Sequence, residues 1–388
     1  MKTIFLYLDG FKYDYLERCQ FLKKFADKNH SARLKVVPLH QFEFNIFSGS
    51  LDHDLWVWYY LDSKTSPYKW LKPWINILKI FDKNKFLSKI MRMKITYFSS
   101  LIYYFKGRTR FVKIAKIPLD KAPLFSVTAK KCYIDKNPMN KPTIFDVLRK
   151  NKTRYLTSEW PLISNQNQIK LKPWIKSEQA RLNYLFKKSN QYDFLFVHLW
   201  KLDTLMHQYG TESREVNNYL KDMDKMLKDF VVKMIRKYKH VKVIISSDHG
   251  MVDIKGSINV IEKLRKNNLR ENIDFISFPG SIMVRLWCKR NKEKTKKVLE
   301  KIPNGKLYDE TNFSELGFKY KRKLVGDYLF LADSGYQIIP NYFDGFKMMK
   351  AEHGYKPVKD ELDGIFISSN KIGKKEIILT DIFDLVLK

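Results

Sequence analysis

The chain has 388 residues, of which 44% are hydrophobic and 15% aromatic, and its formal net charge is +32. This composition excludes a disordered chain and allows one large domain or a domain with an inserted subdomain. The charge favours anionic partners such as phosphorylated metabolites, nucleic acid, acidic glycans or an anionic membrane surface, although a general bias toward lysine would give the same net charge.

The cysteines and the N-terminus indicate a reducing compartment. Cys19, Cys132 and Cys288 lie far apart and form no CxxC pair, which argues against a disulfide scaffold and against a cysteine zinc site. The first apolar run is too short for a signal peptide, and no stretch reaches the ~20 apolar residues that span a bilayer. We therefore expect a soluble, cytoplasmic protein.

The first part of the chain alternates between strand and helix patterns and then changes character. Residues 3–10 predict a buried strand that ends in Asp9, and helical spacing follows. Residues 32–39 predict a second strand. Residues 63–131 instead mix many Lys and Arg with Trp, Tyr and Phe, and they contain very few acids. We interpret them as a helical cap insertion. Its aromatic side chains would either pack on the core or stack on a base or sugar of the substrate. Its cations could bind phosphates or an anionic membrane surface.

Strand and helix patterns return after residue 141. Residues 194–199 predict a buried strand that passes into a loop, and residues 213–238 predict a long amphipathic helix. Residues 241–245 predict another buried strand. The alternation predicts an α/β fold with a doubly wound, mainly parallel sheet flanked by helices. We expect one domain over residues 1–388, with 63–131 as its basic and aromatic cap.

Aspartate and histidine side chains follow these strands or stand next to glycines. Asp203 and His207 are spaced i, i+4, so on a helical turn they would point the same way. Each such residue alone is commonly a cap or a hydrogen-bonded polar group, but ligands gather beyond the carboxyl ends of strands in α/β sheets. The combination therefore predicts a two-ion site, and its mixed nitrogen and oxygen donors favour zinc or another transition metal over magnesium. The set consists of Asp9, Asp203, His207, Asp248, His249 and His353.

The chain resembles the alkaline phosphatase superfamily, and within it the type I phosphodiesterase/nucleotide pyrophosphatase branch, through the segments LDGFKYDYL, PTIFDVLRKN, DTLMHQYG, SDHGM, GDYLFLADSGY and EHGY, in this order. The resemblance covers most of the chain. It implies two divalent metal ions, zinc or alternatively manganese, and hydrolysis of a phosphodiester or pyrophosphate bond in a phosphorylated small molecule or another anionic substrate. The implied ligands are Asp203, His207 and His353 for one ion, and Asp9, Asp248 and His249 for the other.

The resemblance fails at the nucleophile. The family uses Thr or Ser at the start of the helix after the second strand, whereas the matching positions here are Leu39, His40 and Gln41. Ser48 or Ser50 could serve after a rearrangement, hydroxide held by a metal could attack directly, His40 could act as nucleophile or base, or hydrolysis is lost. The sequence therefore assigns no catalytic residue.

Three functions stay open at this point. The favoured one is a metal-dependent hydrolase of phosphodiester or pyrophosphate bonds. The same site could instead serve a phosphomonoesterase or a phosphoryl-group transferase, or a non-catalytic relative could retain the metals and bind a polyanion such as nucleic acid. The intact set of six ligands favours an enzyme, because a chain freed from catalysis has little physical reason to keep Asp and His together at three separate loops.

Overall fold

The computed structural model divides the chain into two compact units. Unit 1 comprises Met1–Leu51, Ile134–Ile254 and Met349–Lys388, and unit 2 comprises Asp52–Tyr133 and Lys255–Met348. The structure describes residues 1–39, 42–52, 54–106, 114, 116–128, 139, 141–158 and 177–388. Among these residues, no helix is both long enough and apolar enough to cross a membrane.

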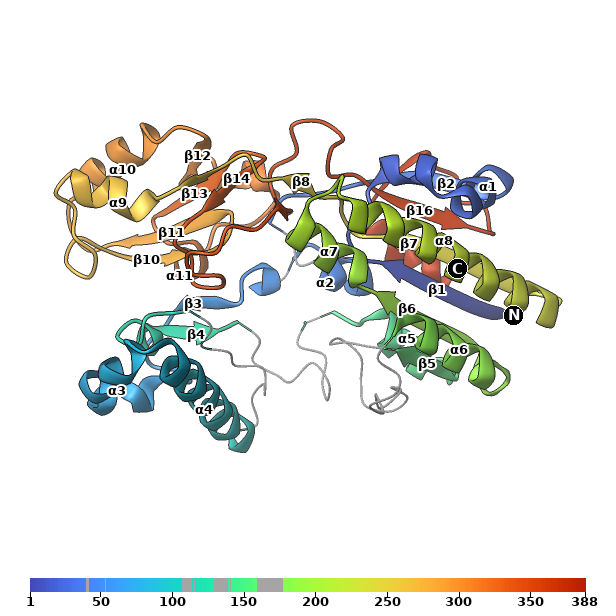
Figure 1. Ribbon diagram of the computed structural model, residues 1–388, viewed down its shortest axis with the longest axis horizontal. Helices are drawn as coiled ribbons and strands as arrows, with labels where there is room; N and C mark the ends of the chain where they lie inside the picture. The colour runs from blue at the N-terminus through green and yellow to red at the C-terminus, as the bar shows by residue number, and fades with distance from the viewer. Residues whose placement is uncertain are drawn as a thin grey trace. The chain divides into compact units, whose positions relative to one another are not determined.

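A seven-stranded sheet forms the centre of unit 1 in the described residues, with strand order β17-β2-β16-β7-β1-β6-β5 (Figure 1). β16 is antiparallel to both of its neighbours, and all other neighbouring strands are parallel. The predicted mainly parallel α/β sheet is therefore confirmed. Its strands are β1 (Lys2–Leu8), β2 (His30–Lys35), β5 (Tyr155–Ser158), β6 (Phe194–Leu199), β7 (Val241–Ser247), β16 (Gly364–Ser368) and β17 (Glu376–Ile378).

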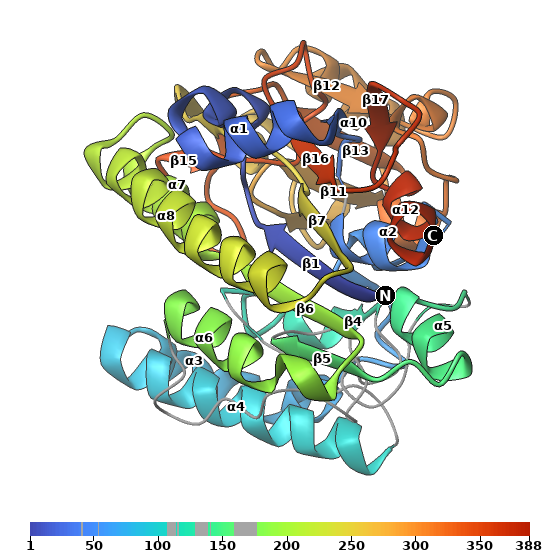
Figure 2. The same cartoon turned by 90° about the vertical axis from the view of Figure 1, so that its right-hand side faces the viewer.

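Helices cover both faces of this sheet (Figure 2). One face carries α1 (Gln20–Lys28), α6 (Glu178–Lys188), α7 (Lys201–Tyr209) and α8 (Arg214–Lys237), with the 3₁₀ turns η1 (Tyr13–Arg18) and η5 (Ser189–Gln191). The other face carries α2 (Phe42–Ser48), α5 (Ile144–Lys150) and α12 (Asp381–Leu387). Side chains alternate along the central strand: Ile4 and Leu6 join the core under α8, whereas Phe5 packs edge-on against Phe196 together with Phe47 of α2. A strand covered on both faces is apolar at every position, which explains the uninterrupted apolar runs in the sequence.

Helix α7 begins almost directly after β6, at the place where the sequence predicts a loop. The loop prediction was wrong because the helix has only nine residues, and just two of its apolar positions are fully buried. These positions, Leu202 and Met206, are one helical turn apart. The same turn brings Asp203 and His207 onto one side of the helix. Gly210 ends α7 with a φ of 93°.

Unit 2 is built on a four-stranded antiparallel sheet with the order β10-β11-β13-β12 in the described residues. These strands are β10 (Phe275–Pro279), β11 (Met283–Cys288), β12 (Gly305–Tyr308) and β13 (Tyr328–Ala332). Two small pairs accompany it: β3 (Tyr59–Leu61) with β4 (Phe125–Val127), and β9 (Gly256–Ile258) with β14 (Tyr336–Ile338). Its helices are α3 (Ile75–Asp82), α4 (Lys85–Phe105), α9 (Val260–Lys266), α10 (Lys292–Glu300) and α11 (Arg322–Val325), and its 3₁₀ turns are η2 (Asp54–Trp56), η3 (Lys69–Trp74), η4 (Ala122–Leu124) and η6 (Phe313–Leu316).

The predicted cap, residues 63–131, falls within unit 2, and its residues 107–113, 115 and 129–131 lie outside the described residues. It contains α3 and α4. Ile95 and Tyr103 of α4 share one buried cluster with Phe278 of β10 and Trp287 of β11. The aromatics on this side of α4 therefore pack within unit 2. The single-domain division and the capping role of this segment stay predictions.

Candidate functional site

The candidate site lies at the carboxyl edge of the sheet in unit 1. β1 runs parallel to both of its neighbours, β6 and β7, and Leu8 is in register with Leu199 and with Ser247. Asp9, the residue after β1, therefore lies beside Asp248, the residue after β7. Gly10 has a φ of 75°, and a Cβ at this position would lie 2.7 Å from Cε of Met206, so the turn after Asp9 requires glycine.

The remaining candidates reach this edge through α7 and a small strand pair. That pair joins β8 (Val252–Asp253) to β15 (Ala351–Glu352), and β15 lies against α7. The backbone N–H of Lys350 donates to the carbonyl of His207 at 2.9 Å, and Nδ1 of His207 lies 2.8 Å from the carbonyl oxygen of Ala351. His353 follows directly after β15, so these hydrogen bonds bring it close to Asp203 and His207.

Asp9, Asp248 and His249 form a tight buried group. Nε2 of His249 lies 3.4 Å from Oδ1 of Asp9 and 3.2 Å from Oδ2 of Asp248. One ligand atom from each of the three residues lies within 4.8 Å of the others. The three residues that the resemblance assigns to one ion are therefore close enough together to bind a single metal ion.

Asp203, His207 and His353 form a neighbouring group. Oδ1 of Asp203 lies 3.5 Å from Nε2 of His207 and 3.8 Å from Nε2 of His353. The ring of His353 stacks on His249 with a centroid distance of 4.0 Å, which joins the two groups. Ligand atoms within 4.8 Å of one another also occur in the sets Asp203–His249–His353 and His207–Glu352–His353. All six residues singled out by the sequence are thus brought together.

The orientation of two imidazoles suits metal ligation. Nδ1 of His207 is hydrogen-bonded to the carbonyl of Ala351, and Nδ1 of His249 lies 3.0 Å from the carbonyl oxygen of Gly250. A carbonyl oxygen can only accept, so each Nδ1 carries a proton and each Nε2 faces the carboxylates, where a bound metal ion would take its lone pair. Oδ1 of Asp248 accepts from the backbone N–H of Gly10 at 3.0 Å, and its Oδ2 accepts from the hydroxyl of Tyr7 at 2.8 Å.

The buried carboxylates and imidazoles of the group would be stabilised by a bound cation. Burial, followed by the charge of Asp9, raises the pKa of Asp203 to about 7. Oδ1 of Asp203 is buried and accepts no hydrogen bond from the described residues, which is costly for a carboxylate oxygen. Burial, followed by the neighbouring His249 and His207, holds the pKa of His353 well below its usual value, so its ring is neutral and able to donate a lone pair. The donor set fits divalent transition metals.

Besides Glu352, two further residues that the sequence reasoning missed adjoin this group. Nε2 of His198, in β6, lies 2.8 Å from Oδ2 of Asp9. Burial opposes ionisation of Asp9, but the hydrogen bonds with His198 and His249 outweigh it and bring its pKa below the usual range. Glu43, in the first turn of α2, is the second missed residue: burial, followed by the charges of Asp9 and Asp248, raises its pKa to about 7. An imidazole inside the apolar run FLFVHL was a usable signal for His198, whereas Glu43 carried none.

The nucleophile candidates give no geometry that selects one of them. His40 and Gln41 lie outside the described residues. The hydroxyl of Ser48 donates to the carbonyl of Phe44 at 2.6 Å and is buried in the last turn of α2, at the opposite end of the helix from Glu43. Ser50 is buried in the turn that follows. The contact of Ser48 with Phe44 is of the kind that a serine makes inside any helix.

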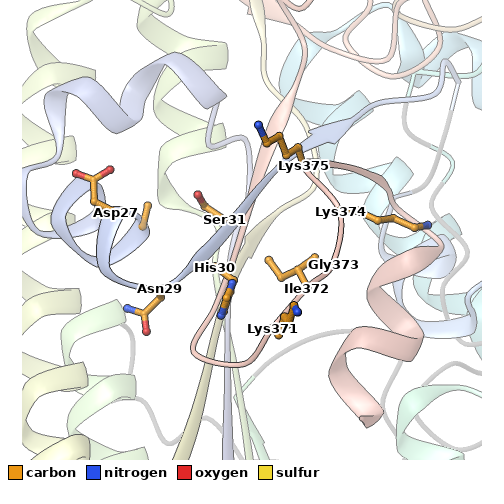
Figure 3. Close-up of a pocket in the computed structure, with 10 residues that line it drawn as sticks. Asp27, Asn29, His30, Ser31, Lys371, Ile372, Gly373, Lys374 and Lys375 are labelled. Atoms are coloured by element: carbon orange, nitrogen blue, oxygen red, sulfur yellow. The ribbon is translucent and has the colours of Figure 1, made fainter.

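A pocket in unit 1 lies at the other edge of the sheet (Figure 3). His30 and Ser31 line it at the start of β2, and Lys371, Lys374 and Lys375 line it from the loop after β16. The amino end of a parallel strand and its carboxyl end are on opposite edges of the sheet. This pocket is therefore separate from the Asp and His group.

Comparison with known proteins identifies relatives of the chain. Residues 116–356 match the family model described as type I phosphodiesterase/nucleotide pyrophosphatase. The fold is similar to that of murine ectonucleotide pyrophosphatase/phosphodiesterase 5, with a TM-score of 0.64 and 16% identity over 100% of this chain and 94% of that chain. The human counterpart gives a TM-score of 0.66 at 14% identity, with 100% and 94% coverage. An inactive form of the murine protein in complex with AMP gives 0.64 at 15% identity, again with 100% and 94% coverage.

Proposed function

Because the chain belongs to the type I phosphodiesterase/nucleotide pyrophosphatase family and is a hydrolase of that kind, we propose that it cleaves a phosphodiester or pyrophosphate bond with two divalent ions held at the carboxyl edge of unit 1. The observation that carries the proposal is the convergence of Asp and His side chains from β1, α7, β7 and the segment after β15. The proposed substrate is a phosphorylated small molecule of the nucleotide type. The AMP complex of the murine relative supports that substrate class.

We divide the six residues between the ions as the resemblance to the family implies. Asp9, Asp248 and His249 would hold one ion. Asp203, His207 and His353 would hold the other, since the carboxylate of Asp203 faces both imidazoles. When bound, such ions polarise the phosphoryl oxygens, provide a nucleophile at neutral pH and stabilise the leaving oxygen. The mixture of imidazole and carboxylate donors supports zinc, with manganese as the alternative.

Residues around the ligands position them and handle the proton. His198 holds the carboxylate of Asp9, which fixes the direction in which its other oxygen points. Glu43 stands in the first turn of α2, two residues after Gln41, the last position that matches the family's hydroxyl-bearing residue, and its charge interacts with those of Asp9 and Asp248. We assign it the role of accepting the proton of the attacking water.

The test is hydrolysis of bis(p-nitrophenyl) phosphate by the full chain. Protein stripped of metal by a chelator should be inactive, and zinc or manganese should restore turnover. His207→Ala should lose turnover and bound metal, measured by mass spectrometry. His240→Ala is the matched control, because His240 is exposed at the amino end of β7 and its substitution should leave both unchanged.

Other outcomes would replace the proposal. Faster cleavage of p-nitrophenyl phosphate than of the diester would indicate a phosphomonoesterase on the same site. Bound metal in a folded protein that cleaves neither these reagents nor nucleotide pyrophosphates would indicate a non-catalytic relative. Chelator-insensitive binding of a polyanion with a steep salt dependence would point the same way.

A further inference from the structure

Most of the exposed large apolar side chains of the described residues lie on one helical hairpin of unit 2. Of 24 such side chains, 13 lie between Trp74 and Phe105. This stretch covers α3, α4 and the residue before α3, and the two helices contact each other. A concentration of this kind on a folded protein usually marks an interaction surface.

Helix α4 is apolar on two opposite sides. Ile95, Ser99 and Tyr103 are buried and follow one another at four-residue intervals, which is the side that packs within unit 2. On the other side, six large side chains repeat at intervals of four, three, four, four and three residues, and each is between 37% and 72% exposed. This repeat matches the helical period, so the six form one stripe about 27 Å long. The outer stripe consists of Phe86, Ile90, Met93, Tyr97, Leu101 and Tyr104.

The outer stripe lies in a strongly cationic stretch. Residues 69–106 contain nine Lys or Arg and a single acid, Asp82. Asp82 is neutralised by Arg92, whose Nη2 lies 2.7 Å from its carboxylate. Lys89 and Lys94 are exposed near the stripe, and within the described residues neither comes within ion-pair distance of a carboxylate. The surface therefore combines a long apolar strip with uncompensated positive charge.

We propose that the outer stripe of α4 docks into the interface of an anionic lipid bilayer, with the helix axis parallel to the membrane. A helix that presents a mixed aromatic and aliphatic strip beside lysines gains both from burial of the apolar groups among acyl chains and from attraction to anionic headgroups. Tyr97 and Tyr104 have the amphipathic rings that favour this depth.

The alternatives fit the surface less well. A second copy of this chain would oppose one cationic stretch with nine basic residues and one acid to another of the same charge. Nucleic acid would engage the lysines but would leave the six apolar side chains without a partner. An anionic bilayer accommodates both features at once.

The first experiment is flotation of the full chain with vesicles of phosphatidylcholine containing 30% phosphatidylglycerol. Wild type should float with these vesicles. Met93→Ser/Tyr97→Ser should lower the partition coefficient by about tenfold or more, because two inserted side chains are removed. Phe346→Ser/Met348→Ser is the matched control in unit 2, since these two residues are 80% and 51% exposed, against 64% and 72% for Met93 and Tyr97. This control should float like wild type.

A second experiment separates charge from apolar insertion. Lys89→Glu/Lys94→Glu should lower the partition into anionic vesicles by about tenfold or more. The control Lys228→Glu/Lys233→Glu makes the same change in net charge at exposed positions of α8 and should have a smaller effect. Circular dichroism and thermal melts establish that all variants are folded.

Three results would overturn the proposal. One is wild type that stays in the soluble fraction with anionic vesicles. Another is a stripe variant that floats as well as wild type. The third is a concentration-dependent dimer in sedimentation that disappears in Met93→Ser/Tyr97→Ser while no variant floats, which would assign the stripe to a second copy of the chain.

Discussion

The carboxyl edge of unit 1 buries ionisable side chains, whereas the outer stripe of α4 in unit 2 exposes apolar ones. At the carboxyl edge, Asp248 and His249 are buried almost completely among further carboxylates and imidazoles. On α4, large side chains such as Phe86 and Tyr97 are left in contact with solvent. Burying ionisable groups and exposing apolar ones both cost free energy.

The difference teaches what each region requires from outside the chain. The buried carboxylates need positive charge, which a divalent ion provides. The exposed stripe needs an apolar environment with negative charge at its border. In both places the cost of the arrangement in the isolated protein indicates the chemistry of the missing partner.

The largest expected effect tests whether the carboxyl edge depends on ionised ligands. Asp248→Asn keeps the shape of the side chain and its hydrogen bond with Gly10 but removes the charge. We expect activity with bis(p-nitrophenyl) phosphate to fall about a thousandfold, or about 4 kcal/mol of transition-state stabilisation. Single-turnover kinetics at saturating zinc provide the measurement. Activity within tenfold of wild type would mean that Asp248 does not ligate an ion.

The next effect compares the two sides of α4. Ile95→Ala removes a side chain that is buried in the core of unit 2 and should lower the free energy of unfolding by about 2–4 kcal/mol. Met93→Ala, on the outer stripe, should change it by less than about 0.5 kcal/mol. Urea unfolding followed by circular dichroism measures both. Equal losses for the two variants would show that the outer stripe is packed in solution.

A third effect concerns the partly buried carboxyl group of Glu43 in metal-free protein. Burial, with the charges of Asp9 and Asp248, raises its pKa from 4.5 to about 7, so the folded state holds a proton that the unfolded state releases. The contribution of Glu43 to stability is thus complete below about pH 4.5 and is lost as the pH rises to about 7.

Glu43→Gln removes this dependence. The variant should match wild type near pH 4 and exceed its free energy of unfolding near pH 8 by up to about 3 kcal/mol, measured in the presence of a chelator. Glu215→Gln, at an exposed position of α8, is the matched control and should leave the pH dependence unchanged. A Glu43→Gln curve parallel to that of wild type would contradict a raised pKa.

The smallest effect concerns a positioning residue. His198→Ala leaves the carboxylate of Asp9 without its hydrogen bond and should weaken zinc binding by about tenfold to a hundredfold. His198→Gln retains a donor and should recover part of the loss. Competition with a fluorescent chelator measures the affinity. An unchanged affinity in His198→Ala would mean that His249 alone orients Asp9.

The sequence predicted the parts of the fold that depend on local pattern. The apolar run over 194–199 became β6, and the strand that ends before Asp248 became β7. The meeting of six Asp and His residues was also accessible, because ligands gather at one edge of an α/β sheet. Helix α7 was missed since its nine residues make fewer than three turns, which is a short window for a helical period.

Features set by long-range pairing were beyond the sequence. The position of β1 between β6 and β7 aligns Asp9 with Asp248, and no local pattern encodes that order. The apolar run around His198 marked it as unusual, but only the pairing of β6 with β1 places it beside Tyr7 and next to Asp9. Likewise, unit 2 joins residues 52–133 to residues 255–348, which are far apart in the chain.

The position of β16 has a consequence for synthesis. This strand lies between β2 and β7 in the sheet, yet it comes later in the chain than both of them. On the ribosome, β2 cannot join the sheet through β16 before residue 368 has emerged, and until then β2 and β7 each have an open hydrogen-bonding edge. Folding of unit 1 can therefore be completed only once β16 has been synthesised. A nascent chain stalled before β16 would be the species most exposed to edge-to-edge aggregation and the one in greatest need of a chaperone.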